Sequence, residues 1–334
     1  MKSFLKQKIE KNLVSVIIVT YNQEKYIKDT IKSILNQNYN NIEIIIADDG
    51  TPNFNVENIK KYIEEKKKEN IKYISVNTNK NNLGTVKNIN NALRLTRGGY
   101  IKIIGGDDTF FSSTTFSDQI KVLEFDHTKY AVIGKANQCD EFMNSIYDKR
   151  VDDSNKAISS VLSMNFSDAM RYIHYNDLFP IAIQTICFRR VFFEKMGLCD
   201  EEYYLIDDAP TVIKILECSK FMCFTDDYSV NHRGKIGISA TKKIFDTNKI
   251  MYYKDNMIYF KKEIRNRKNI FGFFYRNEMT RLYEYIYMVT LYKKNKHKFW
   301  DFVKLTILKS DALVYFILTR PKKVFERLFL YRSV

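Results

Sequence analysis

The sequence predicts an α/β protein: a Rossmann-like, mostly parallel sheet flanked by helices, followed by a helical C-terminal extension. Apolar β-branched runs alternate with segments of helical spacing up to residue 104, which is the pattern of strands joined by crossover helices. Polar residues and glycines directly follow each of these runs. The last quarter of the chain has a different composition and only helical periodicity, so we expect it to form a separate region.

The elements of the first half follow from the spacing of the apolar residues. Continuous β-branched runs such as VSVIIV fit strands that are buried on both faces. The expected strands are 14–19, 42–47, 71–76 and 100–104. The expected helices are 24–37, 56–68 and 85–96. Because crossover connections between such strands are right-handed, the four strands should lie parallel in one sheet.

Composition sets the expected domain boundary. The 334 residues are 45% hydrophobic, which is enough for a substantial core, so disorder is not expected. Residues 241–334 contain 22 Lys and Arg against 8 Asp and Glu, a net charge of +14, whereas residues 1–240 contain 32 against 31. The same last quarter holds 21 of the 48 aromatic residues. We therefore expect one domain over 1–240 and a basic, aromatic-rich helical region over 241–334.

Cysteine usage and the N-terminus indicate a cytoplasmic protein. The five cysteines include no C-x-x-C pair, so neither a disulfide framework nor a thiolate zinc site is predicted. The first apolar run begins at Leu13 and ends at Tyr21 without a small-residue cleavage site, so we expect no signal peptide. No run reaches the roughly 18 apolar residues that a membrane-spanning helix needs.

The residues that follow the strands carry the functional signal, because ligands bind beyond the carboxyl ends of strands in such sheets. These segments are Thr20-Tyr21-Asn22, Asp48-Asp49, the loop ending at Gly84, and Gly105-Gly106-Asp107-Asp108. Neither a G-x-G-x-x-G fingerprint nor a P-loop is present, so phosphates would not be held by glycine backbone. Proteins also commonly bind phosphates through a divalent cation that is held by carboxylates.

The pair Asp107-Asp108 has two interpretations. Neighbouring carboxylates raise each other's pKa, and Mg²⁺ or Mn²⁺ relieves this while taking its other ligands from water and substrate phosphates. Alternatively, Gly-Gly-Asp-Asp forms a turn whose acidic residues cap the next helix. The pair Asp48-Asp49 follows another strand, so two acidic pairs would converge on one crevice, which favours the metal.

The chain resembles the inverting nucleotide-sugar glycosyltransferases of family 2, which have the GT-A fold. The resemblance lies in VSVIIVTYNQEKYIKDTIKSILNQNYNNIEIIIADDGT and NNLGTVKNINNALRLTRGGYIKIIGGDD, matched in order, spacing and residue type, and it extends to about residue 240. It implies a nucleotide-sugar donor, with UDP as the expected nucleotide, and Mn²⁺ or Mg²⁺ as cofactor.

The resemblance also implies roles for individual residues. Those matching donor contacts are Thr20, Tyr21, Asn22, Asp48, Asp49, Asn82, Gly84, Lys87, with Asn88 beside it, and Asp107. Asp107 and Asp108 fall on the D-x-D region, whose last carboxylate ligates the metal, and His232 matches a position facing the diphosphate. The first acidic position of that region is Gly105 here, so either Asp108 takes a ligand role or the ribose contact is lost.

The stretch RRVFFEKMGLCDEEYYLIDDAPTVIKI, residues 189–215, resembles the part of the family that supplies the catalytic base. Asp208 matches that base, with Asp207 in place of the usual Glu; the alternative is that both acids cap the following helix. His232 also fits an ordinary surface or core histidine. Arg233 and Lys235 beside it are candidates for neutralising phosphate charge. Whether Gln184 and Arg189 border the acceptor is left open.

Residues 245–334 are predicted to be helical. Ile250, Tyr253, Met257 and Phe260 recur at helical spacing, as do Tyr283, Ile286, Tyr287 and Val289, and a basic amphipathic helix is expected from Pro321 onward. Basic charge with aromatic residues is typical of helices at an anionic membrane surface; the alternative is packing on the first domain. Many members of the resembled family extend a glycan or lipid-linked saccharide at the inner face of a bacterial membrane, which implies a peripheral cytoplasmic location.

Three other functions compete with this one. A nucleic-acid-binding protein would fit the charge, but acidic residues at the sheet edge would repel phosphates, so no nucleic-acid partner is expected. A nucleotidyltransferase would have a glycine-rich basic loop where TYNQEKYIKD stands. A catalytically inactive glycosyltransferase-like assembly module is compatible with Gly105. The donor sugar, the acceptor and the linkage depend on pocket shape rather than on these motifs.

Overall fold

The computed structural model describes residues 8–178, 181–234 and 247–295. The chain divides into two compact units, Met1–Ala240 and Thr241–Val334.

The first unit is an α/β structure built on one sheet. Its strands are β1 Glu10–Thr20, β2 Ile42–Asp48, β3 Ile71–Thr78, β4 Gly98–Gly105, β5 Thr109–Phe110, β6 Ala131–Cys139, β7 Ile186–Arg189 and β8 Met222–Arg233. Its α-helices are α1 Ile27–Leu35, α2 Val56–Lys66, α3 Thr85–Leu93, α4 Thr115–Phe125, α5 Lys149–Ser163, α6 Phe166–Asn176, α7 Arg190–Met196 and α8 Asp208–Glu217. Two 3-10 turns, η1 Ile183–Thr185 and η2 Ser219–Phe221, precede β7 and β8.

The described strands lie in the order β3-β2-β1-β4-β7-β6-β8-β5. The four predicted strands are present as β1 to β4, and every pair among them is parallel, as expected. β7 inserts antiparallel between β4 and β6, while β8 runs parallel to β6 and antiparallel to β5. The prediction of a mostly parallel sheet flanked by helices is confirmed.

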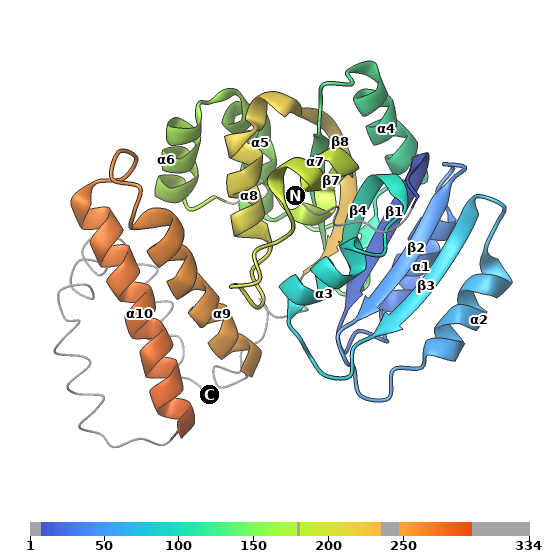
Figure 1. Cartoon of the computed structure of the whole chain (residues 1–334), viewed down its shortest axis with the longest axis horizontal. Coiled ribbons are helices and arrows are strands. Elements are labelled where there is room, and N and C mark those ends of the chain that lie inside the picture. The colour runs from blue at the N-terminus through green and yellow to red at the C-terminus, as the bar shows by residue number, and fades with distance from the viewer. Residues whose placement is uncertain (1–7, 179–180, 235–246, 296–334) are drawn as a thin grey trace. The chain divides into compact units, whose positions relative to one another are not determined.

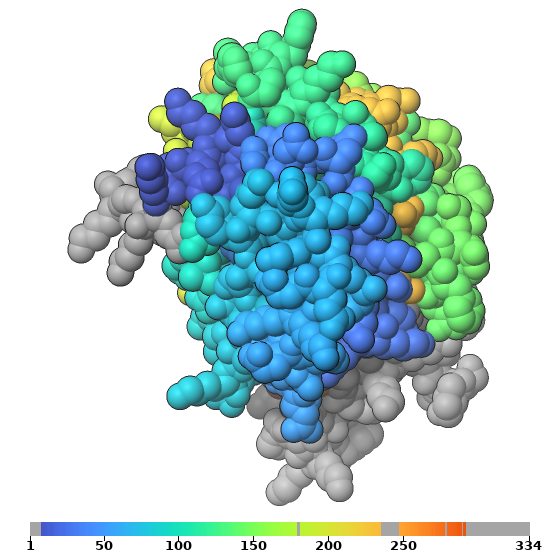
Figure 2. Space-filling view, turned by 90° about the vertical axis from the view of Figure 1, so that its right-hand side faces the viewer, coloured from blue at the N-terminus to red at the C-terminus, as the bar shows by residue number. Residues whose placement is uncertain are grey.

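The core lies on both faces of β1, β2 and β4, whose central residues are almost completely buried. Alternate β1 residues Val14, Val16 and Ile18 belong to one cluster with apolar residues of α1, α2 and α4. β2 and β3 are added on one side of β1, whereas β4 is added on its other side, and the right-handed crossover to β4 places α3 on the opposite face (Figure 1). Figure 2 shows this half of the unit from its α2 side, as one continuous surface of blue and light-blue residues. The addition of strands on both sides of β1 makes the gap between the ends of β1 and β4 a topological switch point.

Over residues 247–295, the second unit has two helices joined by a turn. α9 Thr247–Tyr259 continues into a π-helical turn, η4 Phe260–Ile264, and the chain returns along α10 Phe273–Asn295 (Figure 1). The predicted helices are therefore present up to residue 295, and the stacked rings of Phe260 and Tyr283 (4.4 Å) join them. Among the described residues, no helix is both long and apolar enough to cross a membrane. The amphipathic helix expected from Pro321 lies outside the described residues.

Candidate active site

The carboxyl ends of β1, β2 and β4 bring three of the predicted polar segments to one edge of the sheet. Thr20 lies opposite Asp48 in the β1–β2 register, and Val19 lies opposite Gly105 in the β1–β4 register. The Asp49 N–H donates to the Thr20 carbonyl over 2.9 Å, which extends the alignment one residue past the strands. The segments after these strands are thus direct neighbours, as the sequence predicts.

The segment after β1 leaves the sheet in a sharp turn. Asn22 has a φ of 55°, in the left-handed region that Asn tolerates better than most residues, and its N–H donates to Thr51 Oγ1 over 2.8 Å. Thr20 is buried, and its Oγ1 has no hydrogen-bond partner in the structure. Tyr21 is half-buried. A buried hydroxyl without a partner is costly, so this position is suited to a polar ligand group.

Asp48 organises the turn after β2. Its Oδ2 accepts from the N–H groups of Gly50 (3.2 Å) and Thr51 (3.0 Å) and from Thr78 Oγ1 (2.6 Å). Its Oδ1 is buried without a hydrogen-bond partner. One oxygen therefore fixes the backbone, and the other retains its capacity to accept a hydrogen bond.

Asp49 fixes the loop between β3 and α3. Its Oδ1 accepts from the Leu83 N–H (2.8 Å) and from Asn79 Nδ2 (3.0 Å), and its Oδ2 accepts from the Gly84 N–H (2.8 Å). Burial raises the pKa of Asp49, although these three hydrogen bonds lower it. The resemblance placed Asp49 beside the donor but gave no sign of this loop-holding role, because its backbone donors, Leu83 and Gly84, lie more than 30 residues away.

The β3–α3 loop is also tied to the segment before α8. Gly84 has a φ of 88°, and a Cβ there would lie 2.5 Å from the Tyr204 carbonyl oxygen. Asn82 Oδ1 accepts from the Tyr204 hydroxyl over 2.6 Å. Lys87 is exposed on α3, whereas Asn88 is buried and donates to the Ala47 carbonyl over 2.7 Å. The structure therefore holds Asn82 and Gly84 in the loop that follows Asp49, with Lys87 on the adjoining helix.

The acidic pair after β4 is buried and held unequally. Burial, and next the charge of Asp108, raise the pKa of Asp107 to about 6, despite the opposing charges of His232 and Arg233. Asp108 is engaged by three groups: the Arg233 N–H (2.8 Å), His232 Nδ1 (3.2 Å) and Gln184 Nε2 (3.2 Å). The pair leads into β5 and caps no helix, so the helix-capping interpretation does not apply.

The presence of glycine at position 105 is explained by its neighbour Asp107. A Cβ at this position would lie 2.8 Å from Asp107 Oδ1, so a side chain there would displace the Asp107 carboxylate from its present position. Glycine at the end of β4 thus leaves space for Asp107.

His232 lies among the carboxylates. Burial by itself lowers the pKa of His232, but the hydrogen bond to Asp108 and the charges of Asp108, Asp107 and Asp208 outweigh it and raise the pKa to about 9. The antiparallel pairing of β5 with β8, with Phe110 opposite Val230, carries the end of β8 to the acidic pair. His232 is therefore at the predicted site rather than on a remote surface.

Asp208 is the first residue of α8, and its Oδ1 accepts from the Ile183 N–H over 2.9 Å. Burial raises the pKa of Asp208, against the Ile183 hydrogen bond and the His232 charge; the Asp108 charge raises it further. Burial, and then Asp208, raise the pKa of Asp207 well above its ordinary value. Asp207 occupies the N-cap position but makes no side-chain capping hydrogen bond. The capping alternative is thus not supported for Asp207.

Arg233 does not take the phosphate-facing position that the sequence offered for it, and Arg189, whose place was left open, lies away from the acidic pair. The Arg233 side chain is 3% exposed and donates to the Asp107 carbonyl (2.8 Å), to Asp29 (2.8 Å) and to the Glu141 carbonyl, so it joins segments instead of facing a phosphate. Arg189 lies opposite Tyr100, at the amino end of β4, far along the strand from the acidic pair. Lys235 lies outside the described residues.

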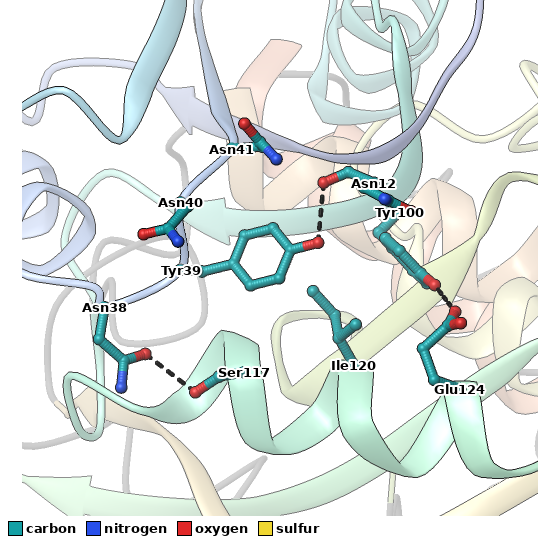
Figure 3. A pocket seen from close by; sticks show the side chains of 9 residues that line it. All are labelled: Asn12, Asn38, Tyr39, Asn40, Asn41, Tyr100, Ser117, Ile120 and Glu124. Atoms are coloured by element: carbon teal, nitrogen blue, oxygen red, sulfur yellow. Dashed lines mark hydrogen bonds between the residues drawn. The ribbon is translucent and has the colours of Figure 1, made fainter.

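A separate pocket of about 420 Å³ opens at the amino ends of the strands (Figure 3). It is lined by Asn12, Asn38, Tyr39, Asn40, Asn41, Tyr100, Ser117, Ile120 and Glu124. The Tyr39 hydroxyl donates to the Asn12 carbonyl over 2.7 Å, and burial raises its pKa to about 12. None of the predicted site residues lines this pocket.

The residues present are compatible with a divalent cation bound together with substrate. Within residues 8–178, 181–234 and 247–295, no three His, Cys, Asp or Glu side chains are arranged to hold a metal by themselves. Mg²⁺ commonly rests on one or two carboxylates, with the other positions taken by water and phosphate oxygens. Asp107 and Asp108 provide hard oxygen ligands, and a cation beside them would oppose the burial and the Asp108 charge that raise the pKa of Asp107.

A family model described as "Glycosyl transferase family 2" matches residues 15–195, more than half of the chain. This chain belongs to glycosyl transferase family 2. The match contains the ends of β1 to β4 and with them the polar segments described above. The sequence prediction of a family 2 glycosyltransferase is therefore confirmed.

Individual relatives are glycosyltransferases as well. The chain is 40% identical to an uncharacterized glycosyltransferase of Haemophilus influenzae over 29% of this chain and 28% of that protein. It is 29% identical to the uncharacterized glycosyltransferase EpsJ of Bacillus subtilis, over 59% of this chain and 54% of EpsJ. It is 37% identical to Escherichia coli WfaP, a UDP-Glc:alpha-D-GlcNAc-diphosphoundecaprenol beta-1,3-glucosyltransferase, over 34% of this chain and 41% of WfaP. The chain thus spans about half or less of the length of these relatives.

Solved glycosyltransferases have the same fold. S. aureus TarS 1–349 in complex with UDP has a TM-score of 0.53 at 16% identity, covering 94% of this chain and 82% of that chain. The mannosyltransferase PcManGT from Pyrobaculum calidifontis, in complex with GDP-Man and Mn²⁺, has a TM-score of 0.54 at 17% identity, covering 99% and 89%. At such identities the likeness concerns the fold alone, and it confirms the predicted GT-A class for this family 2 glycosyltransferase.

Proposed function

We propose that this glycosyltransferase transfers a sugar, with inversion at the anomeric carbon, from a UDP-sugar to a hydroxyl of a glycan or lipid-linked saccharide. The product would belong to a surface polysaccharide or glycoconjugate. The observation that carries the proposal is the meeting of Asp208, Asp108 and His232, which come from α8, the turn after β4 and β8. His232 Nδ1 lies 3.2 Å from Asp108 Oδ1, and the charge of Asp108 raises the pKa of both His232 and Asp208.

Asp208 is the proposed catalytic base. An inverting transfer requires a group that takes the acceptor proton while the bond to the diphosphate breaks on the opposite face of the sugar. The Ile183 N–H fixes one carboxylate oxygen of Asp208, which leaves the other for an acceptor hydroxyl. The raised pKa of Asp208 makes it a stronger base than an exposed aspartate.

Asp107, Asp108 and His232 are the residues that would hold Mn²⁺ or Mg²⁺. The ion, when bound, supplies positive charge that stabilises the leaving diphosphate. Asp108 is oriented by Arg233 and Gln184, whereas Asp107 takes its buried position in the space that Gly105 leaves.

The donor would be bound by the segments after β1, β2 and β3. Thr20 Oγ1 and Asp48 Oδ1 are buried polar atoms without a hydrogen-bond partner, as expected where a ligand group completes the bonding. Tyr21, Asn22, Asp49, Asn82, Gly84 and Lys87 complete the proposed donor side. UDP is supported by TarS 1–349, solved with UDP and with UDP-GlcNAc, and by WfaP, whose name specifies UDP-Glc.

A lipid-linked acceptor and a peripheral position on the cytoplasmic membrane face are supported by two observations. The acceptor in the name of WfaP carries diphosphoundecaprenol. Residues 241–334 carry 22 Lys and Arg against 8 Asp and Glu, a charge that attracts an anionic membrane surface. In this proposal residues 1–240 form the catalytic domain and residues 241–334 the membrane-associating region.

The test is nucleotide release from a panel of UDP- and GDP-sugars with and without Mn²⁺, using wild type, Asp208→Asn and the exposed-site control Glu202→Gln. We expect Mn²⁺-dependent UDP release that falls roughly 10²- to 10⁴-fold in Asp208→Asn and is unchanged in the control. The anomeric configuration of a transferred product, read by NMR, tests inversion. An absence of release with every donor would favour the inactive assembly module instead.

A further inference from the structure

Two neighbouring phenylalanines project from the turn that joins the helices of the second unit. Phe273 and Phe274 are 66% and 69% exposed, and their rings contact each other edge to face, with centroids 5.8 Å apart. They are the first two residues of α10, directly after Gly272. Among the described residues of this unit, no other large apolar side chain is exposed to that degree.

The turn is held firmly on both sides of this pair. Phe271 is 1% exposed, and its ring stacks on that of the buried Tyr275 at 5.3 Å. The buried Arg276 donates to the carbonyl of Phe271 (3.0 Å) and to that of Arg265 (2.8 Å). The exposure of Phe273 and Phe274 is therefore not due to a loose helix end, because the residues on either side of them are packed.

The surroundings of the pair are strongly basic. Residues 261–276 contain six Lys or Arg and a single acidic residue, Glu263, which is paired with Arg267 at 2.9 Å. Arg265 and Lys268 are exposed on the same turn. We call residues 265–274 the tip. It combines two exposed phenylalanines with neighbouring positive charge.

We propose that the tip inserts Phe273 and Phe274 into the headgroup region of an anionic lipid bilayer, with Arg265 and Lys268 contacting lipid phosphates. The aromatic rings would leave water for the boundary of the acyl chains, and the cations would remain among the headgroups. Each basic residue near such a surface adds about fivefold in binding. The proposal rests on the membrane partner given under Proposed function and specifies it, but it does not depend on the donor chemistry.

The test is co-sedimentation with vesicles made of equal parts phosphatidylcholine and phosphatidylglycerol, compared with phosphatidylcholine alone. The full chain is used as wild type, as Phe273→Ser/Phe274→Ser, as Arg265→Gln/Lys268→Gln, and as Phe125→Ser. Phe125 is 94% exposed on α4 in the first unit, so its variant controls for the loss of an exposed aromatic residue. Circular dichroism and UDP release establish that each variant is folded.

We expect the phenylalanine variant to lose at least about tenfold in partitioning to the mixed vesicles, whereas Phe125→Ser binds like wild type. The basic-residue variant should bind the mixed vesicles roughly 25-fold more weakly, about fivefold for each residue, and its binding should depend less on salt. If the phenylalanine variant bound vesicles like wild type, insertion of the tip would be overturned, and membrane association would have to occur through another segment. A wild type that binds no vesicle would overturn both, whereas UDP release would still test the catalytic proposal. If the tip instead mediated binding to a single-stranded oligonucleotide and not to vesicles, the lipid proposal would be overturned and the partner would be a nucleic acid.

Discussion

The backbone N–H of Arg233 donates a 2.8 Å hydrogen bond to Oδ1 of Asp108, so the last residue of β8 orients the acidic pair that follows β4. The side chain of the same arginine donates to the carbonyl of Asp107 and to Asp29 in α1, each over 2.8 Å. Arg233 thus joins three segments that are distant in sequence, and it orients the proposed metal ligands without being one of them.

Replacing Arg233 by lysine should destabilise the protein and weaken catalysis together. Lysine keeps the charge but loses the planar fork that reaches several acceptors at once. We expect a loss of about 2–4 kcal/mol in the free energy of unfolding, because buried carbonyls lose their donors. Urea unfolding and Mn²⁺-dependent UDP release measure the two effects.

The matched control is Arg94→Lys. Arg94 forms a half-exposed ion pair with Glu201 at 3.2 Å, and such pairs contribute at most about 1 kcal/mol. If Arg233→Lys were no more destabilising than Arg94→Lys, the joining role of Arg233 would be wrong.

The ionisation of Asp107 should make metal-free protein less stable as pH rises. Its pKa is about 6 in the folded chain and near 3.8 when unfolded, so between these values the native state binds more protons. The contribution is present in full below about pH 4 and is lost as pH rises through 6. Asp107→Asn removes this pH dependence. Above pH 7 and without metal, the free energy of unfolding of the variant should exceed that of wild type by roughly 2–3 kcal/mol.

Thermal unfolding at pH 4.5 and 7.5 without metal, and at pH 7.5 with Mn²⁺ and UDP, checks this. The gain of Asp107→Asn over wild type should grow between the two pH values, and Mn²⁺ with UDP should stabilise wild type more than the variant. Asp118→Asn, at an exposed carboxylate on α4, should show neither change. A pH-independent difference for Asp107→Asn would contradict the prediction.

Gly84→Ala should be more damaging than substitution of an equally left-handed glycine elsewhere. Gly84 and Gly197 have φ values of 88° and 74°, so alanine is strained at both positions. At Gly84 the new Cβ would also lie 2.5 Å from the Tyr204 carbonyl oxygen, whereas at Gly197 nothing lies within 4 Å. We expect a cost of about 1 kcal/mol for Gly197→Ala and about 3 kcal/mol for Gly84→Ala.

Urea unfolding of the two variants isolates the steric part as their difference. Because Gly84 also donates its N–H to Asp49, Gly84→Ala should in addition weaken UDP binding, measured by calorimetry. Equal costs for the two variants would show that the contact with Tyr204 contributes nothing.

The sequence predicted the parts of the fold that local pattern determines. The runs at 14–19 and 42–47 are buried on both faces, and they appear as β1 and β2 within a few residues of the expected bounds. β7 was not predicted, because its four residues ICFR carry no strand signal by themselves and depend on β4 and β6 on either side.

The site shows the same division. The segments after β1, β2 and β4 were predicted to lie at one edge of the sheet, because the ends of parallel strands lie there, and the strand registers confirm this placement. The loop-holding bonds of Asp49 and the buried position of Arg233 were not predicted. Both depend on partners brought close by chain pairing, and no spacing in the sequence records them.

Gly105→Ala should change the Mn²⁺ dependence of UDP release while having little effect on the free energy of unfolding. The new Cβ would lie 2.8 Å from Oδ1 of Asp107, and this atom is the end of a side chain that can rotate away. The cost in unfolding free energy should therefore stay near 1 kcal/mol or below, while the carboxylate that would contact the metal is displaced. We expect the Mn²⁺ concentration for half-maximal UDP release to rise several-fold, with the KM for an acceptor unchanged.

Gly272→Ala is the control, since a Cβ there meets nothing within 4 Å. A glycine at the first acidic position of the D-x-D region then has a physical meaning: it leaves room for the Asp107 carboxylate beside the buried Asp108. If Gly105→Ala responded to Mn²⁺ like wild type, Asp107 would not be a metal ligand, and Asp108 with His232 would be the remaining candidates.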